Sequence, residues 1–149
     1  MNASHILLAP DRPLVVDLGE EWAAPPLPEN ATNRELGAWG EELAARNFRA
    51  RGIDVLDRNW RCRQGEIDLV CWDPQRRTLF ACEVKTRREG GFVPSLESVS
   101  RSKLARLRLL LSQWLASHDY CGAAVSIDVV AITVREGEGW DLCHVEAVA

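Results

Sequence analysis

Apolar residues recur every three or four positions over residues 33–51, the period that places side chains on one face of a helix. The recurring positions are Leu36, Trp39, Leu43, Ala44 and Phe48. Thr32 and Glu35 have the spacing of a capping box at the start of this stretch, and Gly52 follows it as a stop signal. The pattern therefore predicts a helix that ends near Arg51.

Two glycines, Gly37 and Gly40, fall inside this predicted helix. Glycine is a poor helix former, so its use in a helix interior suggests that a larger side chain would not fit. We therefore expect another part of the backbone to approach the helix closely at both positions.

Three segments with strand-like composition follow the helix: Ile53–Arg58, Glu66–Trp72 and Thr78–Lys85. Turn-forming residues at positions 73–77 separate the last two segments. These two segments should therefore pair as an antiparallel hairpin.

A second helix and two further strands complete the pattern. Ser100 or Ser102 can cap a helix that runs to about Ser117. The nearly continuous apolar run Val125–Val134 predicts a buried strand, and Trp140–Val148 predicts a final strand at the sheet edge. The order αβββαββ, with a helix crossing between the third and fourth strands, predicts an α/β fold in which helices flank a mixed sheet.

Residues 1–32 differ in composition from the rest, because they hold five of the seven prolines and few residues able to form a core. We expect a flexible acidic arm here, followed by one domain over residues 33–149. No run of about eighteen apolar residues and no signal-peptide pattern is present, so we expect a cytoplasmic protein with no membrane contact. The five cysteines include no CxxC pair, and Cys71 and Cys82 should be small buried residues.

The net charge of -4 argues at first against a nucleic-acid partner. The charge is uneven, however: residues 34–108 carry 16 basic and 11 acidic residues, a net charge of +5. Arginine dominates these cations, and its planar fork suits phosphate. Charge alone still favours an ordinary solvated surface.

Acidic residues on the predicted hairpin carry the candidate chemistry. Alternation places Glu83 and Lys85 on one strand face, and Asp68 can lie across from Glu83 on the neighbouring strand. Neighbouring carboxylates raise one another's pKa, and Mg²⁺ or Mn²⁺ would relieve their repulsion. An exposed Glu83–Lys85 ion pair beside a solvated Asp68 would fit the spacing equally well. Asp128 interrupts an apolar strand, and we interpret it as a structural acid paired with an arginine.

Three sequence blocks occur in a fixed order: Gly37-x-x-Gly40-Glu41-x-x-Ala44, Arg58-Asn59-Trp60-Arg61-x-x-x-Gly65-Glu66-Ile67-Asp68-Leu69-Val70 and Phe80-x-x-Glu83-Val84-Lys85-Thr86-Arg87. Together they resemble the YraN-like family of predicted bacterial endonucleases. That family is related to archaeal Holliday-junction resolvases and to the PD-(D/E)xK nuclease superfamily. The resemblance covers residues 34–134. It implies a restriction-endonuclease-like fold and metal-dependent hydrolysis of DNA phosphodiester bonds, with branched or structured DNA as a candidate substrate.

The resemblance also implies a catalytic set of Glu41, Asp68, Glu83 and Lys85. Asp68 and Glu83 would be metal ligands together with the backbone carbonyl of Val84, and Glu41 would complete the site. Lys85 would be the catalytic lysine, and the cofactor would be Mg²⁺ or Mn²⁺. Glu66 is either an outer acid of this site or a structural residue.

DNA is the partner that the resemblance implies, and a homodimer would allow two strands to be cut symmetrically. The candidates for contacts to the DNA backbone are Arg58, Arg61, Arg63, Arg87, Arg88 and Arg101. Trp60 and Trp72 could stack on bases, although packing against the sheet is the more usual role of such residues. The alternative function is a non-catalytic DNA-binding or adaptor module that keeps the nuclease fold.

Overall fold

A computed structural model describes residues 6–8, 24–27, 29–90, 99–120, 122–135 and 139–149. The elements in these residues are β1 (Ile6–Leu8), α1 (Asn33–Ala50), β2 (Asp54–Cys62), β3 (Gly65–Asp73), β4 (Thr78–Arg88), α2 (Arg101–Ala116), β5 (Ala124–Arg135) and β6 (Gly139–Val145). From α1 onward their order is αβββαββ, so the predicted α/β fold is confirmed.

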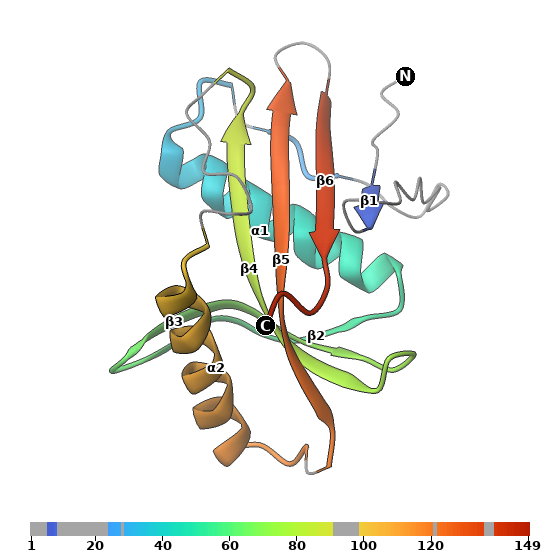
Figure 1. The fold of residues 1–149 in the computed structure, drawn as a ribbon. Helices are drawn as coiled ribbons and strands as arrows, with labels where there is room; N and C mark the ends of the chain where they lie inside the picture. The colour runs from blue at the N-terminus through green and yellow to red at the C-terminus, as the bar shows by residue number, and fades with distance from the viewer. Residues whose placement is uncertain (1–5, 9–23, 28, 91–98, 121, 136–138) are drawn as a thin grey trace.

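The strands form one mixed sheet in the order β1-β6-β5-β4-β3-β2 (Figure 1). Strands β2, β3 and β4 form an antiparallel meander. Strand β5 is parallel to β4, as the crossover through α2 requires, and β6 is antiparallel to β5.

The outer edge of this sheet differs from the prediction. Strand β1 pairs in parallel with Leu142–His144 of β6, so β6 is an inner strand and not the edge. The three residues of β1 belong to the stretch that we expected to be an arm. Farther along the same stretch, the Pro25 carbonyl accepts a hydrogen bond of 2.8 Å from the Trp39 indole. The other predicted arm positions 1–5, 9–23 and 28 lie outside the described residues.

Two strands are longer than their local sequence indicates. Strand β2 continues to Cys62 because residues 60–62 pair with residues 65–67 of β3. Strand β4 continues to Arg88 because its whole length pairs with β5. In both cases polar side chains end the apolar pattern while backbone pairing continues.

The two helices cover opposite faces of the sheet (Figure 1). Helix α1 packs over a cluster that includes Leu43, Phe48 and Phe80, together with Cys71 and Cys82, which are buried as predicted. The cluster under α2 includes Ile67, Leu110, Trp114 and Ile127. Trp60 and Trp72 pack against this second cluster, which supports their interpretation as packing residues.

Local signals set the helix ends as the sequence predicts. The Glu35 amide donates to Thr32 Oγ1 at 3.2 Å, and the Thr32 amide donates to Glu35 Oε2 at 2.9 Å, which completes the capping box. Gly52 has a positive φ of 79° just after α1. Ser100, and not Ser102, caps α2 by accepting from the Lys103 amide.

Only one of the two glycines in α1 marks a close approach. A Cβ built on Gly40 would lie 1.8 Å from Thr86 Oγ1 of β4, so this position has no room for a side chain. The neighbour is a β4 side chain and not, as expected, its backbone. A Cβ built on Gly37 would meet nothing within 4 Å, so the prediction for that residue is wrong.

Asp128 is fully buried in β5 and has the structural role that we expected. Its Oδ2 atom accepts from Arg76 at 3.0 Å and lies 2.8 Å from His144 Nε2. Its Oδ1 atom accepts from the Ser126 hydroxyl and the Ala147 amide, both at 2.9 Å. These partners satisfy the carboxylate and hold the pKa of Asp128 below its usual value, against the opposing effect of its burial.

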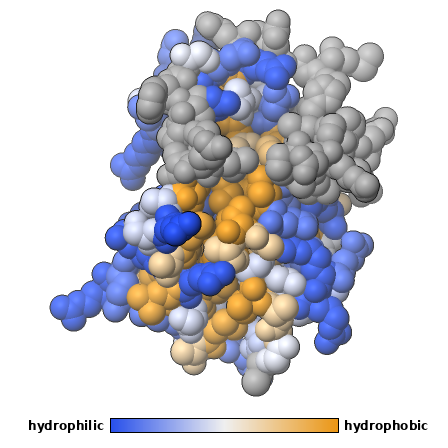
Figure 2. All heavy atoms as spheres, viewed as in Figure 1, coloured by the Kyte–Doolittle hydropathy of each residue, from blue (hydrophilic) through white to orange (hydrophobic). Residues whose placement is uncertain are grey.

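The face that carries α2 shows a central band of apolar side chains between hydrophilic flanks (Figure 2). Among the described residues, the large hydrophobic side chains that remain exposed are Leu109 and Val125, at 50% and 55% exposure. Neither α1 nor α2, the two helices of the described chain, is long and apolar enough to cross a membrane.

Candidate functional site

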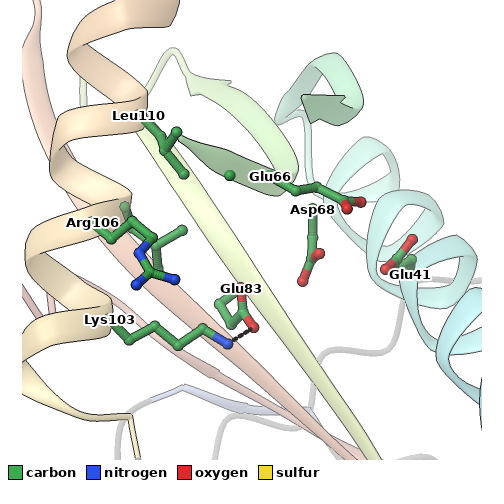
Figure 3. Close-up of a pocket in the computed structure, with 9 residues that line it drawn as sticks. Glu41, Glu66, Asp68, Glu83, Lys103, Arg106 and Leu110 are labelled. Carbon is green, nitrogen blue, oxygen red and sulfur yellow. Dashed lines mark hydrogen bonds and ion pairs between the residues drawn. The ribbon is translucent and has the colours of Figure 1, made fainter. Parts of the chain in front are cut away.

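One cavity of about 400 Å³ lies between the sheet and α2. The acids that line it are Glu41 from α1, Glu66 and Asp68 from β3, and Glu83 from β4. Lys103 and Arg106 of α2 lie on the opposite side, as Figure 3 shows. The fold thus brings together all four acids that were predicted for the site, Glu66 among them as an outer acid or a structural residue.

Asp68 lies where the ladder between β3 and β4 ends. The last paired residues are Leu69 and Cys82, one step away from Asp68. Asp68 Oδ2 accepts a hydrogen bond of 2.9 Å from the Val84 amide. The carboxylate thus ties the two strands together at the point where their backbone pairing stops, next to Glu83.

The surroundings of Asp68 disfavour its charged form. Burial has the largest effect on its pKa, and the charge of nearby Glu83 adds to it. The Val84 hydrogen bond opposes this change, but the charges of Glu41 and Glu66 reinforce it. Together these effects raise the pKa of Asp68 to about 7. Such a carboxylate is stabilised in its charged form by a nearby cation.

Glu83 is already paired with two ammonium groups. Its Oε1 atom lies 2.6 Å from Lys103 Nζ and 3.1 Å from Lys85 Nζ. Its side chain is only 9% exposed, whereas that of Lys85 is 46% exposed. Burial has the largest single effect on the pKa of Lys103 and lowers it, but the hydrogen bond to Glu83 and the other nearby polar and charged groups together outweigh burial and raise the pKa. Lys85 contacts Glu83 but does not itself line the cavity.

Glu41 and Glu66 complete the acidic side of the cavity. Burial raises the pKa of Glu41, and a hydrogen bond from Asn59 partly offsets this effect. Glu66 forms an ion pair of 3.1 Å with Arg61. The neighbouring acid Glu42 does not line the cavity and pairs with arginines instead.

The donor atoms of this cavity fit a hard divalent cation, because they are carboxylate oxygens facing a polar space. Asp68, Glu83 and Glu41 line the cavity and could hold such an ion, whereas Val84, whose carbonyl the resemblance names as a ligand, does not line it. In the part of the chain that the structure describes, however, no three such side chains are already grouped to hold a metal ion. Binding would therefore require side-chain movement, above all at Glu83, and water could supply further ligands.

Four of the six arginines named as DNA contacts make contacts within the protein. Arg58 pairs with Glu42 at 2.6 Å, and Arg61 pairs with Glu66. Arg87 donates a hydrogen bond of 3.1 Å to the Thr133 hydroxyl, and Arg88 donates one of 2.6 Å to the Ala31 carbonyl. The remaining two are exposed and form no ion pair with another described residue: Arg63 in the β2–β3 turn and Arg101 at the start of α2.

Two further residues that line the cavity, Lys103 and Arg106, are not predicted as site residues from the sequence. Both belong to the first turns of α2 and border the face that Leu107 and Leu110 bury. A cation beside an apolar helix face is usually a surface residue. Their position over Glu83 depends on how α2 packs on the sheet, which no pattern within α2 reveals.

Residues 40–132 match the model of a family described as "Uncharacterised protein family UPF0102". The chain is 47% identical over 115 residues to a UPF0102 protein of Kineococcus radiotolerans, and the aligned residues cover 76% of this chain and 93% of that protein. It is 48% identical over 120 residues to one of Acidothermus cellulolyticus, with 73% and 89% covered. A third, from Mycobacterium ulcerans, is 38% identical over 117 residues, with 78% and 96% covered.

Proposed function

This chain belongs to the UPF0102 family, the YraN-like family that its three sequence blocks resemble, and we propose that it is a metal-dependent endonuclease acting on DNA. The substrate would be a phosphodiester bond, and the cofactor would be Mg²⁺ or Mn²⁺.

One observation carries this proposal: the convergence of Glu41, Asp68 and Glu83 from three elements on one cavity, with Lys85 beside them. The raised pKa of Asp68 indicates that charging this carboxyl costs stability, and a bound cation would offset that cost. A purely structural role would be better served by paired charges, as around Asp128. This difference favours the nuclease over the non-catalytic DNA-binding module.

Asp68 and Glu83 would hold the ion, with Glu41 and the Val84 carbonyl as further ligands. When bound, a divalent cation withdraws electron density from a phosphoryl group and offsets charge that develops on it. Lys85 can reach substrate because its side chain is half-exposed, and its ammonium group would stabilise the same developing charge. In the reaction the oxygen of water would bond to phosphorus and give up a proton, and the bond from phosphorus to the 3′-oxygen would break. The 3′-oxygen would take up a proton and leave as a hydroxyl group, with the phosphate remaining on the 5′ side.

The substrate class follows from the family resemblance and from arginine chemistry. Contacts from Arg63 and Arg101 to the DNA backbone would position a strand without reading its sequence. Branched DNA, which is recognised by shape, is the substrate that we propose to test first. A homodimer acting on both strands of a junction would match the symmetry of that substrate.

A cleavage assay tests this function. The purified chain is incubated with four-way-junction, flap and linear duplex DNA in Mg²⁺ or Mn²⁺, with EDTA as the control. We expect metal-dependent cleavage of at least one substrate and a loss of at least about 100-fold in rate for Asp68→Asn and Lys85→Ala. Three results would refute the proposal: cleavage in EDTA, cleavage by both variants at the rate of the parent protein, or no cleavage of any substrate.

Metal binding itself gives a second test that needs no DNA. An ion that binds only the folded chain raises the melting temperature. We expect Mn²⁺ to raise the melting temperature of the parent protein more than that of Asp68→Asn. An equal rise in both proteins would show that Asp68 does not hold the ion.

A further inference from the structure

Two cations on the α2 side of the cavity, Lys103 and Arg106, have no role in the proposed reaction. Lys103 and Arg106 are three residues apart in α2, a spacing that places both on the same helix face. Figure 3 shows both side chains extending from α2 toward the acids of the opposite side. The cavity therefore has an acidic wall and a basic wall.

Lys103 occupies the carboxylate that a divalent cation would need. Its Nζ atom lies 2.6 Å from Glu83 Oε1, closer than Lys85 to the same oxygen. A divalent ion bound to Glu83 would take up the negative charge of this carboxylate and repel the ammonium group of Lys103. Binding of the ion at Glu83 would therefore displace Lys103 and leave its charge without a carboxylate partner.

Arg106 has no ion-pair partner among the described residues, although it faces the acidic cavity. Its stem lies beside the β2–β3 hairpin, where a Cβ built on Gly65 would be 3.6 Å from Arg106 Cδ. This distance is that of an ordinary van der Waals contact, so the stem lies close to the start of β3. Arg106 is exposed, and the donors of its guanidinium group form no ion pair with another described residue.

We propose that Lys103 and Arg106 form a phosphate-binding wall, and that Lys103 exchanges Glu83 for a phosphate oxygen of the DNA when a divalent cation binds. This inference rests on the proposed function of the same cavity. When the ion occupies the acidic wall, Lys103 and Arg106 face the cavity without carboxylate partners. A ligand that pairs with them must therefore carry a negative charge. A phosphodiester supplies that anion, and the forked donors of arginine match its oxygens.

Binding of Mn²⁺ without DNA tests the exchange at Glu83. Titration calorimetry compares the parent, Lys103→Gln and Arg108→Gln, a control on the same helix that removes the same charge. Residues two positions apart do not share a helix face, so the control leaves the wall that contains Arg106 intact. We expect Lys103→Gln to bind Mn²⁺ about 3–10-fold more tightly than Arg108→Gln does, since a competing ion pair is removed. Equal affinities would overturn the exchange.

The salt dependence of DNA binding tests the phosphate contacts. Binding of labelled duplex DNA is measured with Ca²⁺ in place of Mg²⁺, to prevent cleavage, over a series of salt concentrations. Each phosphate contact adds about 0.9 to the slope of log affinity against log salt. We expect Lys103→Gln and Arg106→Gln each to lower the slope by about this amount, and Lys103→Arg and Arg108→Gln to keep it. Unchanged slopes in both Gln variants of the wall would overturn the phosphate-binding wall.

The two proposals fail in different ways. If the parent protein cuts DNA but Lys103→Gln behaves like Arg108→Gln in both measurements, the phosphate-binding wall is wrong and the nuclease stands. If the wall variants change metal and DNA binding as expected but the parent cuts nothing, the nuclease is wrong and the wall stands. If the parent binds neither Mn²⁺ nor DNA, both are wrong.

Discussion

Asp68 shows how one residue can be shaped by groups that its own strand does not supply. Its carboxylate bonds to the Val84 amide of the neighbouring strand, while burial and Glu83 disfavour its charge. The pairing of the two strands could be predicted from the sequence. The lysine of α2 that shares Glu83 could not, because nothing near Lys103 in the sequence refers to β4.

The raised pKa of Asp68 predicts how the stability of the metal-free protein depends on pH. Its ordinary pKa is 3.8 and its pKa in the folded chain is about 7, so between these values the folded state binds the proton more tightly. This group therefore makes the protein less stable as pH rises from about 4 to about 7. At pH 8 in EDTA, we expect Asp68→Asn to be more stable than the parent by about 1–3 kcal/mol, measured by urea unfolding.

At pH 4 this advantage should largely disappear, because the parent carboxyl is then protonated too. Asp54→Asn is the matched control, since Asp54 is exposed at the start of β2. A control that gains as much stability at pH 8 as Asp68→Asn would contradict the assignment to Asp68.

Among the elements, α1 and β4 depend most on a fine detail of packing. Helix α1 brings Glu41 to the cavity, and Gly40 next to it lies against Thr86 of β4. The sequence marked two glycines as equivalent, but only one meets a neighbour. The helix periodicity predicts which face is buried, whereas the distance to the sheet depends on side chains of both elements.

Alanine at these two glycines should have opposite effects on stability. We expect Gly40→Ala to lower the free energy of unfolding by about 1–3 kcal/mol, since its Cβ would overlap the branched Thr86 side chain. Gly37→Ala should raise it by up to about 1 kcal/mol, because the new Cβ meets no neighbour and alanine favours the helix. Chemical unfolding of the two variants measures both. A similar loss in both would contradict the close approach at Gly40.

At the scale of the whole molecule, the described residues include two groups of charged side chains with different properties. The Asp128 group links β5, β6 and the β3–β4 turn, and its carboxylate has four polar partners. The cavity group lies at the meeting of α1, the sheet and α2, where Asp68 and Glu41 form no ion pair with another described residue. The first group is satisfied by partners within the fold, and the second is the proposed site of the divalent cation.

Loss of the Asp128 charge should therefore destabilise the protein without any compensation from a metal ion. We expect Asp128→Asn to lower the free energy of unfolding by about 3–5 kcal/mol at pH 7, because Arg76 would lose its buried partner. Asp141→Asn, which removes a more exposed pair with Arg135, should cost less than about 1 kcal/mol. Thermal unfolding with and without Mn²⁺ compares them. Equal stability of the two variants would contradict this role of Asp128.

The sequence by itself predicted the two helices with their capping signals, the order of the elements from α1 to β6 and, through the resemblance, the acids that line the cavity. These features depend on residues a few positions apart, on period-two alternation or on the three sequence blocks. Only the tertiary structure decided that β1 pairs with β6, that Gly40 and not Gly37 meets β4, and that Lys103 and Arg106 face the acids. Those features arise from packing between elements that are far apart in the chain. The position of a residue in one element then depends on the side chains of the element that packs against it.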